Sequence, residues 1–258
     1  MVDVITAFLL FITGLIAGIL GGLLGIGGCV IMLPSLSFIF NYSLPIAIGT
    51  TITAVILTAS SGAIGHIRMK NVDFGTAKIV AISGAVGAGV GSVIFIYIAN
   101  ELSLLNLILG FAFLYVALRM IYEGIIKRKM PERTGNSVPG SKASKGTIGF
   151  FIGVVTGIVG LGGGYALVPS FIYLLGSAVK IAVGTSLASF ITMAVVSGAF
   201  KLYQGLVDVV AAISLGIGAV IGAQIGARLV RIIPSWVIKA LFGFVFLYVS
   251  LRFIWQLL

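Results

Sequence analysis

Two glycine-rich interruptions of apolar segments have the composition of an anion-binding site. They are Gly25-Ile26-Gly27-Gly28 and Gly160-Leu161-Gly162-Gly163-Gly164, and each precedes a short apolar segment that contains a proline. A helix that begins directly after such a break presents free N–H groups and the positive end of its dipole. Glycine also lets a small oxyanion approach the main chain itself. We therefore predict that an anion binds at the residues of the two breaks, namely Gly27, Gly28, Cys29, Gly162, Gly163 and Gly164.

Several polar side chains are candidates for the same pocket. Hydroxyls donate to an anion without the desolvation cost of a charge, although membrane Ser and Thr often bond back to their own helix instead. Tyr165 is a further candidate, with aromatic packing as the alternative. For the thiol of Cys29, contact with the substrate competes with a role as a small apolar filler. The hydroxyl candidates are Thr50, Thr51, Thr185 and Ser186.

His66 is the only histidine and stands near the end of an apolar segment, beside Arg68 and Lys70. It is a candidate for proton coupling in transport, and an interfacial, structural histidine is the alternative. Lys201 falls near the aligned position in the second half of the chain. We therefore expect no symmetric pair of proton carriers.

The absence of certain residue types and motifs excludes several classes of function. Carboxylates inside spanning segments are typical of proton pumps and cation carriers, and here the six acidic residues all map near segment ends or loops. The sequence contains no Walker A motif, no HExxH and no cluster of Cys and His. We expect no cofactor, no metal and no enzyme activity. An intramembrane hydrolase that uses Ser60 or Ser61 with His66 is a weaker alternative, because no GxSxG turn accompanies these residues.

The composition then defines the elements that must position these residues. Hydrophobic residues make up 60% of the 258-residue chain, charged residues only 9%, and there are 36 glycines. A soluble fold of this length has too little interior for so much apolar surface, so the excess must face lipid. The net charge of +10 does not indicate nucleic-acid binding, because most Lys and Arg lie at segment ends. We predict an all-α polytopic membrane protein with the lipid bilayer as its environment.

The apolar segments repeat in two halves. The motif around the first break, with Leu33-Pro34-Ser35 behind it, recurs around the second break with Val168-Pro169-Ser170. The segments 29–41 and 164–176 are each about half a bilayer long, and whether they cross fully or re-enter stays open, so we expect eight to ten transmembrane segments. We predict a first repeat over 1–126, a linker over 127–146 and a second repeat over 147–258.

The charges predict opposite orientations for the two repeats. The linker carries Lys127, Arg128 and Lys129, among other basic residues, which places it in the cytoplasm. Equivalent loops of the two halves differ in basic character, so they lie on opposite faces. This pattern is that of an inverted-topology repeat, with both termini outside the cell membrane. Lys201 and Arg252 fit this assignment less well.

These motifs and their ordered duplication resemble the TauE/SafE sulfite exporter family over nearly the whole chain. Gly160–Gly164 with Gly184-Thr185-Ser186 matches closely, whereas Cys29 and Thr51 depart from the pattern in the first repeat. The resemblance implies transport of sulfur-containing anions such as sulfite, sulfoacetate or related organosulfur compounds. Our reading is a secondary transporter that works by alternating access. An anion channel and a purely structural membrane subunit are the alternatives, and the substrate, the coupling ion and a homo-oligomeric state stay open.

Overall fold

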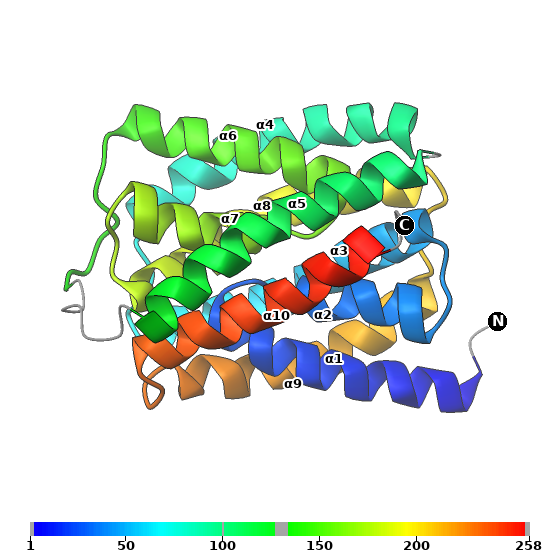
Figure 1. The fold of residues 1–258 in the computed structure, drawn as a ribbon, viewed down its shortest axis with the longest axis horizontal. Coiled ribbons are helices and arrows are strands. Elements are labelled where there is room, and N and C mark those ends of the chain that lie inside the picture. The colour runs from blue at the N-terminus through cyan, green and yellow to red at the C-terminus, as the bar shows by residue number, and fades with distance from the viewer. Residues whose placement is uncertain (1–2, 100, 127–133, 256–258) are drawn as a thin grey trace.

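The computed structural model describes residues 3–99, 101–126 and 134–255, and the regular structure of these residues is helical throughout. Figure 1 shows the helices stacked side by side along one direction. The first repeat comprises α1 (Val4–Leu24), α2 (Cys29–Pro34), the π-helical η1 (Ser35–Ile39), α3 (Leu44–Arg68), α4 (Phe74–Ile98), α5 (Leu102–Ile121) and η2 (Tyr122–Ile126). The second repeat comprises α6 (Lys142–Val159), α7 (Gly164–Pro169), η3 (Ser170–Leu174), α8 (Val179–Tyr203), α9 (Val209–Leu229) and α10 (Ser235–Trp255).

Local signals start and end equivalent helices in the same way. Asp73 accepts a hydrogen bond from the N–H of Thr76 at the start of α4, and Asp208 does the same at the start of α9. Helices α1 and α6 end at Gly25 and Gly160, whose φ angles of 77° and 68° favour glycine. Within the predicted linker, residues 127–133 lie outside the described residues, and α6 already begins at Lys142 behind its N-cap Ser141.

The first helix of each repeat packs parallel to the fourth helix of the other repeat. Along α1, Gly14, Gly18 and Gly22 lie against successive turns of α9, from Leu215 to Ala223. A Cβ at any of these glycines would collide with the α9 backbone, so small residues set the distance between the helices. The glycines of α6 that pack on α4 in the same way are Gly149, Gly153 and Gly157. The two repeats are therefore interlocked.

The third helices show that the repeats are inverted. Gly49, near the start of α3, lies beside Lys201 at the end of α8, and Gly184, near the start of α8, lies beside His66 at the end of α3. Equivalent helices of the two repeats thus run antiparallel. The predicted inverted-topology repeat is confirmed by this packing.

One end of the molecule, which we call the Asp208 end, holds Tyr42, Thr50 and Asp208. The N–H of Asp208 donates to Oγ1 of Thr50 at 3.0 Å, and the hydroxyl of Tyr42 donates to Oδ2 of Asp208 at 2.9 Å. Burial and this carboxylate raise the pKa of Tyr42 to about 12. Helix α1 also begins at this end, because it is parallel to α9. The α2–η1 segment therefore returns to the end from which α1 entered, which makes it re-entrant.

The opposite end, which we call the Asp73 end, repeats the arrangement. The N–H of Val138 donates to Oδ2 of Asp73 at 2.9 Å, and the N–H of Asp73 donates to Oγ1 of Thr185 at 3.0 Å. Helix α6 begins here and α7–η3 turns back here, so both short segments re-enter. The basic residues that gather at this end include Arg68, Lys70, Lys78, Arg228 and Arg231.

The outer surface of the bundle is apolar. Ile82 and Val86 of α4, for example, are 61% and 60% exposed. Seven of the described helices are long and apolar enough to cross a membrane, and the re-entrant segments are shorter. The prediction of an all-α polytopic membrane protein is confirmed. Figure 1 shows both chain ends toward the side where α1 begins.

Candidate functional site

The two glycine breaks meet at the centre of the bundle. A Cβ on Gly27 would lie 2.7 Å from Cζ of Phe190 and 3.0 Å from Cγ1 of Val55. A Cβ on Gly162 would lie 3.0 Å from the same Val55 atom and 3.1 Å from Cε2 of Phe190. Val55 and Phe190 stand near the midpoints of the 25-residue helices α3 and α8. The breaks therefore converge at mid-depth, as their duplication predicts.

The convergence is tight, because a Cβ at any of these glycines would come within about 3 Å of a neighbouring side chain or of the backbone. A Cβ on Gly164 would lie 2.7 Å from Cα of Ile26, which belongs to the opposite break. Gly27, Gly28 and Gly162 have positive φ angles, so side chains there would also strain the backbone. The structure thus brings together the predicted break residues of both repeats, and all of them are buried.

Main-chain N–H groups at both breaks are left without acceptors. Within the described parts of the chain, the amides of Gly28, Cys29, Gly163 and Gly164 make no hydrogen bond, whereas the next turns of α2 and α7 bond back to Gly28 and Gly163. These orphaned donors are expected for the first turn of a helix. Here they belong to two short helices of opposite direction whose first residues meet at one central region, an arrangement that suits a small anion.

The side chains nearest the breaks are mostly engaged in packing. The thiol of Cys29 is buried and donates to the carbonyl of Ile26 at 3.1 Å. The ring of Tyr165 packs against Phe113 and Phe246, at centroid distances of 5.4 and 6.5 Å. The Tyr165 hydroxyl, by contrast, is buried and has no hydrogen-bond partner among the described residues. A polar group left in this state can serve as a donor to a bound ligand.

The four predicted hydroxyls fall into two groups. Thr50 and Thr185 accept backbone N–H groups from loops of the opposite repeat, at the two ends of the molecule. Ser186 lies deeper and donates to the carbonyl of Gly25 at 2.8 Å, so it holds the first break in place. Thr51, at the equivalent position, is buried and its hydroxyl has no partner in the described residues. Of the four, Thr51 is the one whose hydroxyl the fold leaves unused.

Comparison with known proteins shows the family to which the chain belongs. The sulfite exporter TauE/SafE family model matches residues 10–253. The chain belongs to the TauE/SafE family. It is 27% identical to the probable membrane transporter protein YunE of Bacillus subtilis, over 96% of this chain and 97% of that protein. It is 28% identical to YdhB of the same organism, also named a probable membrane transporter protein, over 90% and 94% of the two chains.

A more distant relative, a probable membrane transporter protein of Methanocaldococcus jannaschii, is 26% identical over 86% of this chain and 85% of its own. No solved structure gives a significant match. This TauE/SafE protein is thus a membrane transporter, and the predicted family resemblance is confirmed.

His66 and Lys201, which the sequence already aligns with each other, make equivalent contacts in this TauE/SafE fold. Nε2 of His66 lies 2.9 Å from the carbonyl of Gly22, and Nζ of Lys201 donates to the carbonyl of Gly157 at 3.1 Å. Both side chains are fully buried. The imidazole of His66 is therefore enclosed by protein, with Gly22 of α1 and Gly184 of α8 among its neighbours. A lysine within an otherwise apolar segment was the available signal for the second site.

The hydrolase alternative lacks a catalytic pair in this TauE/SafE chain. The hydroxyl of Ser60 donates to the carbonyl of Ile56, and that of Ser61 donates to the carbonyl of Val220. Neither serine contacts His66, whose Nε2 faces Gly22. Both hydroxyls are engaged with the main chain, so the arrangement does not favour nucleophilic catalysis.

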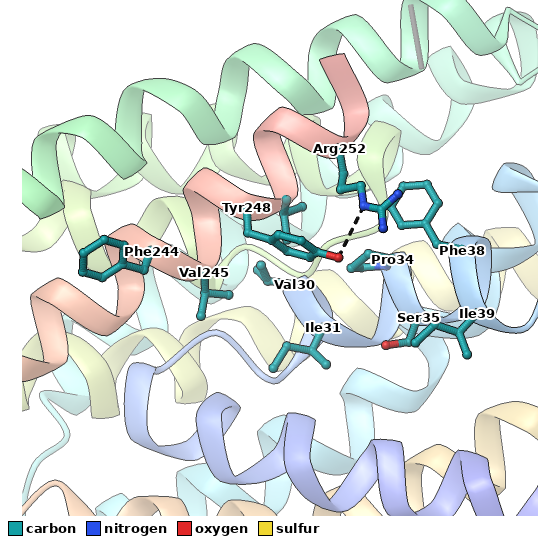
Figure 2. A pocket seen from close by; sticks show the side chains of 11 residues that line it. Val30, Ile31, Pro34, Ser35, Phe38, Ile39, Phe244, Val245, Tyr248 and Arg252 are labelled. Atoms are coloured by element: carbon teal, nitrogen blue, oxygen red, sulfur yellow. Dashed lines mark hydrogen bonds between the residues drawn. The ribbon is translucent and has the colours of Figure 1, made fainter. Parts of the chain in front are cut away.

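A lateral cavity of about 430 Å³ lies between α2–η1 and α10 (Figure 2). Arg252 stands over the ring of Phe38 at 5.4 Å, and its Nε donates to the hydroxyl of Tyr248 at 3.3 Å. Apart from these groups and Ser35, the lining is apolar. Phe244 and Ile39 on its rim are exposed, so the cavity opens toward lipid. The cavity lies on the outer side of α2, whereas Gly27 and Gly162 meet in the interior of the bundle, so the cavity is separate from the meeting point of the breaks.

Proposed function

We propose that this TauE/SafE protein is a secondary transporter for a small anion, namely a sulfur oxyanion or an organosulfur compound such as sulfite or sulfoacetate. The observation that carries the proposal is the meeting of two breaks with orphaned amides beside Phe190 and Val55. An oxyanion there accepts hydrogen bonds from main-chain donors of both repeats. Charge-assisted hydrogen bonds of this kind are roughly twice as strong as neutral ones.

The charges of the described chain support an anion over a cation. Asp73 and Asp208 lie at opposite ends of the molecule, where their carboxylates cap α4 and α9. The residues at the central convergence are glycines, Cys29, Tyr165 and apolar side chains, none of which carries a negative charge. Two helix N-termini add positive potential in a region of low dielectric constant.

Alternating access follows from the way the repeats hold each other. Gly25 of the first break is bonded to Ser186 of α8, and Gly160 of the second break packs on Ile48 of α3. Because α1 is held to α9 and α6 to α4, rotation of these pairs against the third helices moves both breaks and opens the centre first to one face and then to the other. The basic residues at the Asp73 end support a cytoplasmic location for that end and therefore, in this proposal, both termini outside the cell membrane.

The test is flux of labelled sulfite and sulfoacetate into proteoliposomes, with and without an imposed pH gradient. Wild type is compared with Gly163→Leu and with the control Gly89→Leu. Gly163 has φ −47°, so the leucine adds bulk beside Met193 and Ile152 without backbone strain. At Gly89 the nearest atom to a Cβ is 3.9 Å away, so the same substitution is tolerated.

We expect saturable flux and counterflow in wild type and in Gly89→Leu, and loss of both in Gly163→Leu at unchanged membrane insertion. Flux without saturation or counterflow would indicate a channel instead. Undiminished flux in Gly163→Leu would exclude the breaks as the binding site. No flux of either anion in wild type would contradict the proposed substrate class.

A further inference from the structure

Lys201 is a buried cation that no carboxylate neutralises among the described residues. Its Nζ donates to the carbonyl of Gly157 at 3.1 Å and stands 3.1 Å from the ring centroid of Phe95. The side chain is fully buried between α4, α6 and α8. Taking an ammonium out of water costs several kcal/mol, which one carbonyl and one aromatic face offset only in part. Such a residue inside a membrane protein is a candidate for function.

Three unpaired hydroxyls stand on the helix turns that pack around Lys201. Ser92, Thr156 and Ser197 are buried, and their hydroxyls have no hydrogen-bond partner among the described residues. Thr156 is the neighbour of Gly157 on α6, and the backbone N of Ser92 lies 2.5 Å from where a Cβ of Gly157 would be. Ser197 precedes Lys201 by one helical turn, on the same face of α8. One cation and three free hydroxyls are the donors that a small oxyanion requires.

The face of α8 that carries Lys201 leads directly to the central breaks. Phe190, Met193, Ser197 and Lys201 follow one another at steps of three or four residues and are all fully buried. Phe190 contacts the positions of Gly27 and Gly162, and Met193 contacts that of Gly163. The lysine therefore stands between the centre and the Asp208 end.

The other repeat shows that the fold itself does not require this cluster. His66 makes the equivalent contact to a carbonyl, so that contact belongs to the shared scaffold. The three hydroxyls, however, have no counterparts. Their equivalent positions are occupied by Ala227, Gly21 and Gly62. The lysine charge and the three hydroxyls thus have no counterparts in the first repeat. Small residues such as those of the first repeat would be sufficient for packing alone.

We infer that Lys201, Ser92, Thr156 and Ser197 form a second anion subsite, between the central breaks and the Asp208 end of the pathway. The inference rests on the proposed function, since the subsite holds the same sulfur oxyanion on its way to or from the centre. Lys201 supplies the counter-charge, and the hydroxyls replace hydration of the anion.

The experiment compares wild type with Lys201→Met, Lys201→Arg and Ser197→Ala. Ser214→Ala is the control, because that hydroxyl is exposed and bonded only within its own helix. Each variant is assayed for the KM and Vmax of sulfite flux and for the shift in Tm that sulfite or sulfate causes in detergent. We expect Lys201→Met to raise KM by about tenfold or more, the equivalent of one lost charge-assisted hydrogen bond.

Arginine retains the charge, so Lys201→Arg should keep KM near the wild-type value. Ser197→Ala removes a hydroxyl that stabilises nothing in the fold, so a raised KM there at unchanged Tm points to the ligand. Unchanged KM and anion-dependent Tm in both Lys201→Met and Ser197→Ala would overturn the subsite. If Lys201→Met fails to fold, the KM and anion-dependent Tm of Ser197→Ala alone decide whether the subsite exists.

The two readouts also separate this inference from the proposed function. Wild type that is stabilised by sulfite or sulfate but shows no flux would refute transport of these anions, while loss of that stabilisation in Lys201→Met would uphold the subsite. Wild type that neither anion stabilises would overturn the subsite whatever the flux.

Discussion

Ser186 and Thr51 stand at equivalent positions of the two repeats, yet only the serine is bonded to a break. Its hydroxyl donates to the carbonyl of Gly25 at 2.8 Å, whereas the threonine hydroxyl is buried without a partner in the described chain. Replacing Ser186 by alanine should therefore leave the Gly25 carbonyl buried and unsatisfied. Replacing Thr51 by valine, which has the same shape, removes a polar group that forms no bond.

The two substitutions should change the free energy of unfolding in different directions. Leaving one buried acceptor unsatisfied costs about 1–3 kcal/mol, so Ser186→Ala should lower the free energy of unfolding by that amount. Removing an unpaired buried hydroxyl relieves a desolvation penalty, so Thr51→Val should be neutral or stabilising by about 1 kcal/mol. Apparent Tm in detergent, measured for both variants in parallel, gives the comparison without assuming reversible unfolding.

Transport separates the roles further. If Thr51 donates to the anion, Thr51→Val raises the KM for sulfite while Tm stays at or above that of wild type. Equal losses of Tm in Ser186→Ala and Thr51→Val would refute the reasoning, because the two hydroxyls would then be equivalent. A normal KM in Thr51→Val would remove Thr51 from the candidate site.

Two further predictions concern the packing and the loops. Gly18→Val should destabilise the α1–α9 contact by about 1–3 kcal/mol or more, because its Cβ would meet the backbone of Ala219. Size-exclusion chromatography tests this prediction: the monodisperse peak should be lost in Gly18→Val and retained in the control Gly89→Val. Burial alone would raise the pKa of Asp73, but hydrogen bonds from Thr76 and Val138 outweigh it and hold the pKa below its ordinary value of 3.8. The stability that Asp73 confers is therefore present above that value and lost as pH falls through the folded pKa. Asp73→Ala should lower Tm at pH 7, and the gap to wild type should close in acid; a gap that is independent of pH would contradict this assignment.

The sequence was sufficient for the architecture because its signals are local and duplicated. Gly25 and Gly160 end their helices through positive φ angles, and Asp73 and Asp208 cap theirs, so the repeats are readable from residue types alone. Whether the short segments cross or re-enter was not readable. That depends on contacts such as Tyr42 with Asp208, which join residues far apart in the chain.

The candidate site was predictable in its backbone but not in its side chains. A glycine break predicts orphaned amides wherever a helix follows, and the amides of Cys29 and Gly164 are of this kind. A hydroxyl has no such fixed partner. Thr50 and Thr185 bond to loops of the opposite repeat, which no pattern within one repeat could indicate. The cluster around Lys201 was not predictable for the same reason, because its hydroxyls come from three different helices.

The interlocked packing constrains how this transporter can move. Helix α1 is held by glycine contacts to α9, and α6 is held in the same way to α4, so neither first helix can shift without the fourth helix of the other repeat. The breaks at the ends of α1 and α6 instead contact α3 and α8 largely through side chains, such as Val55 and Phe190, which can repack. Sliding is therefore easier at the breaks and along α3 and α8 than within the parallel pairs. For the proposed alternating access, we infer that the moving unit is a first helix together with its partner fourth helix, which passes the third helices that bear His66 and Lys201. The proposed anion site lies at the junction of these units, where a small displacement would change its access to either face.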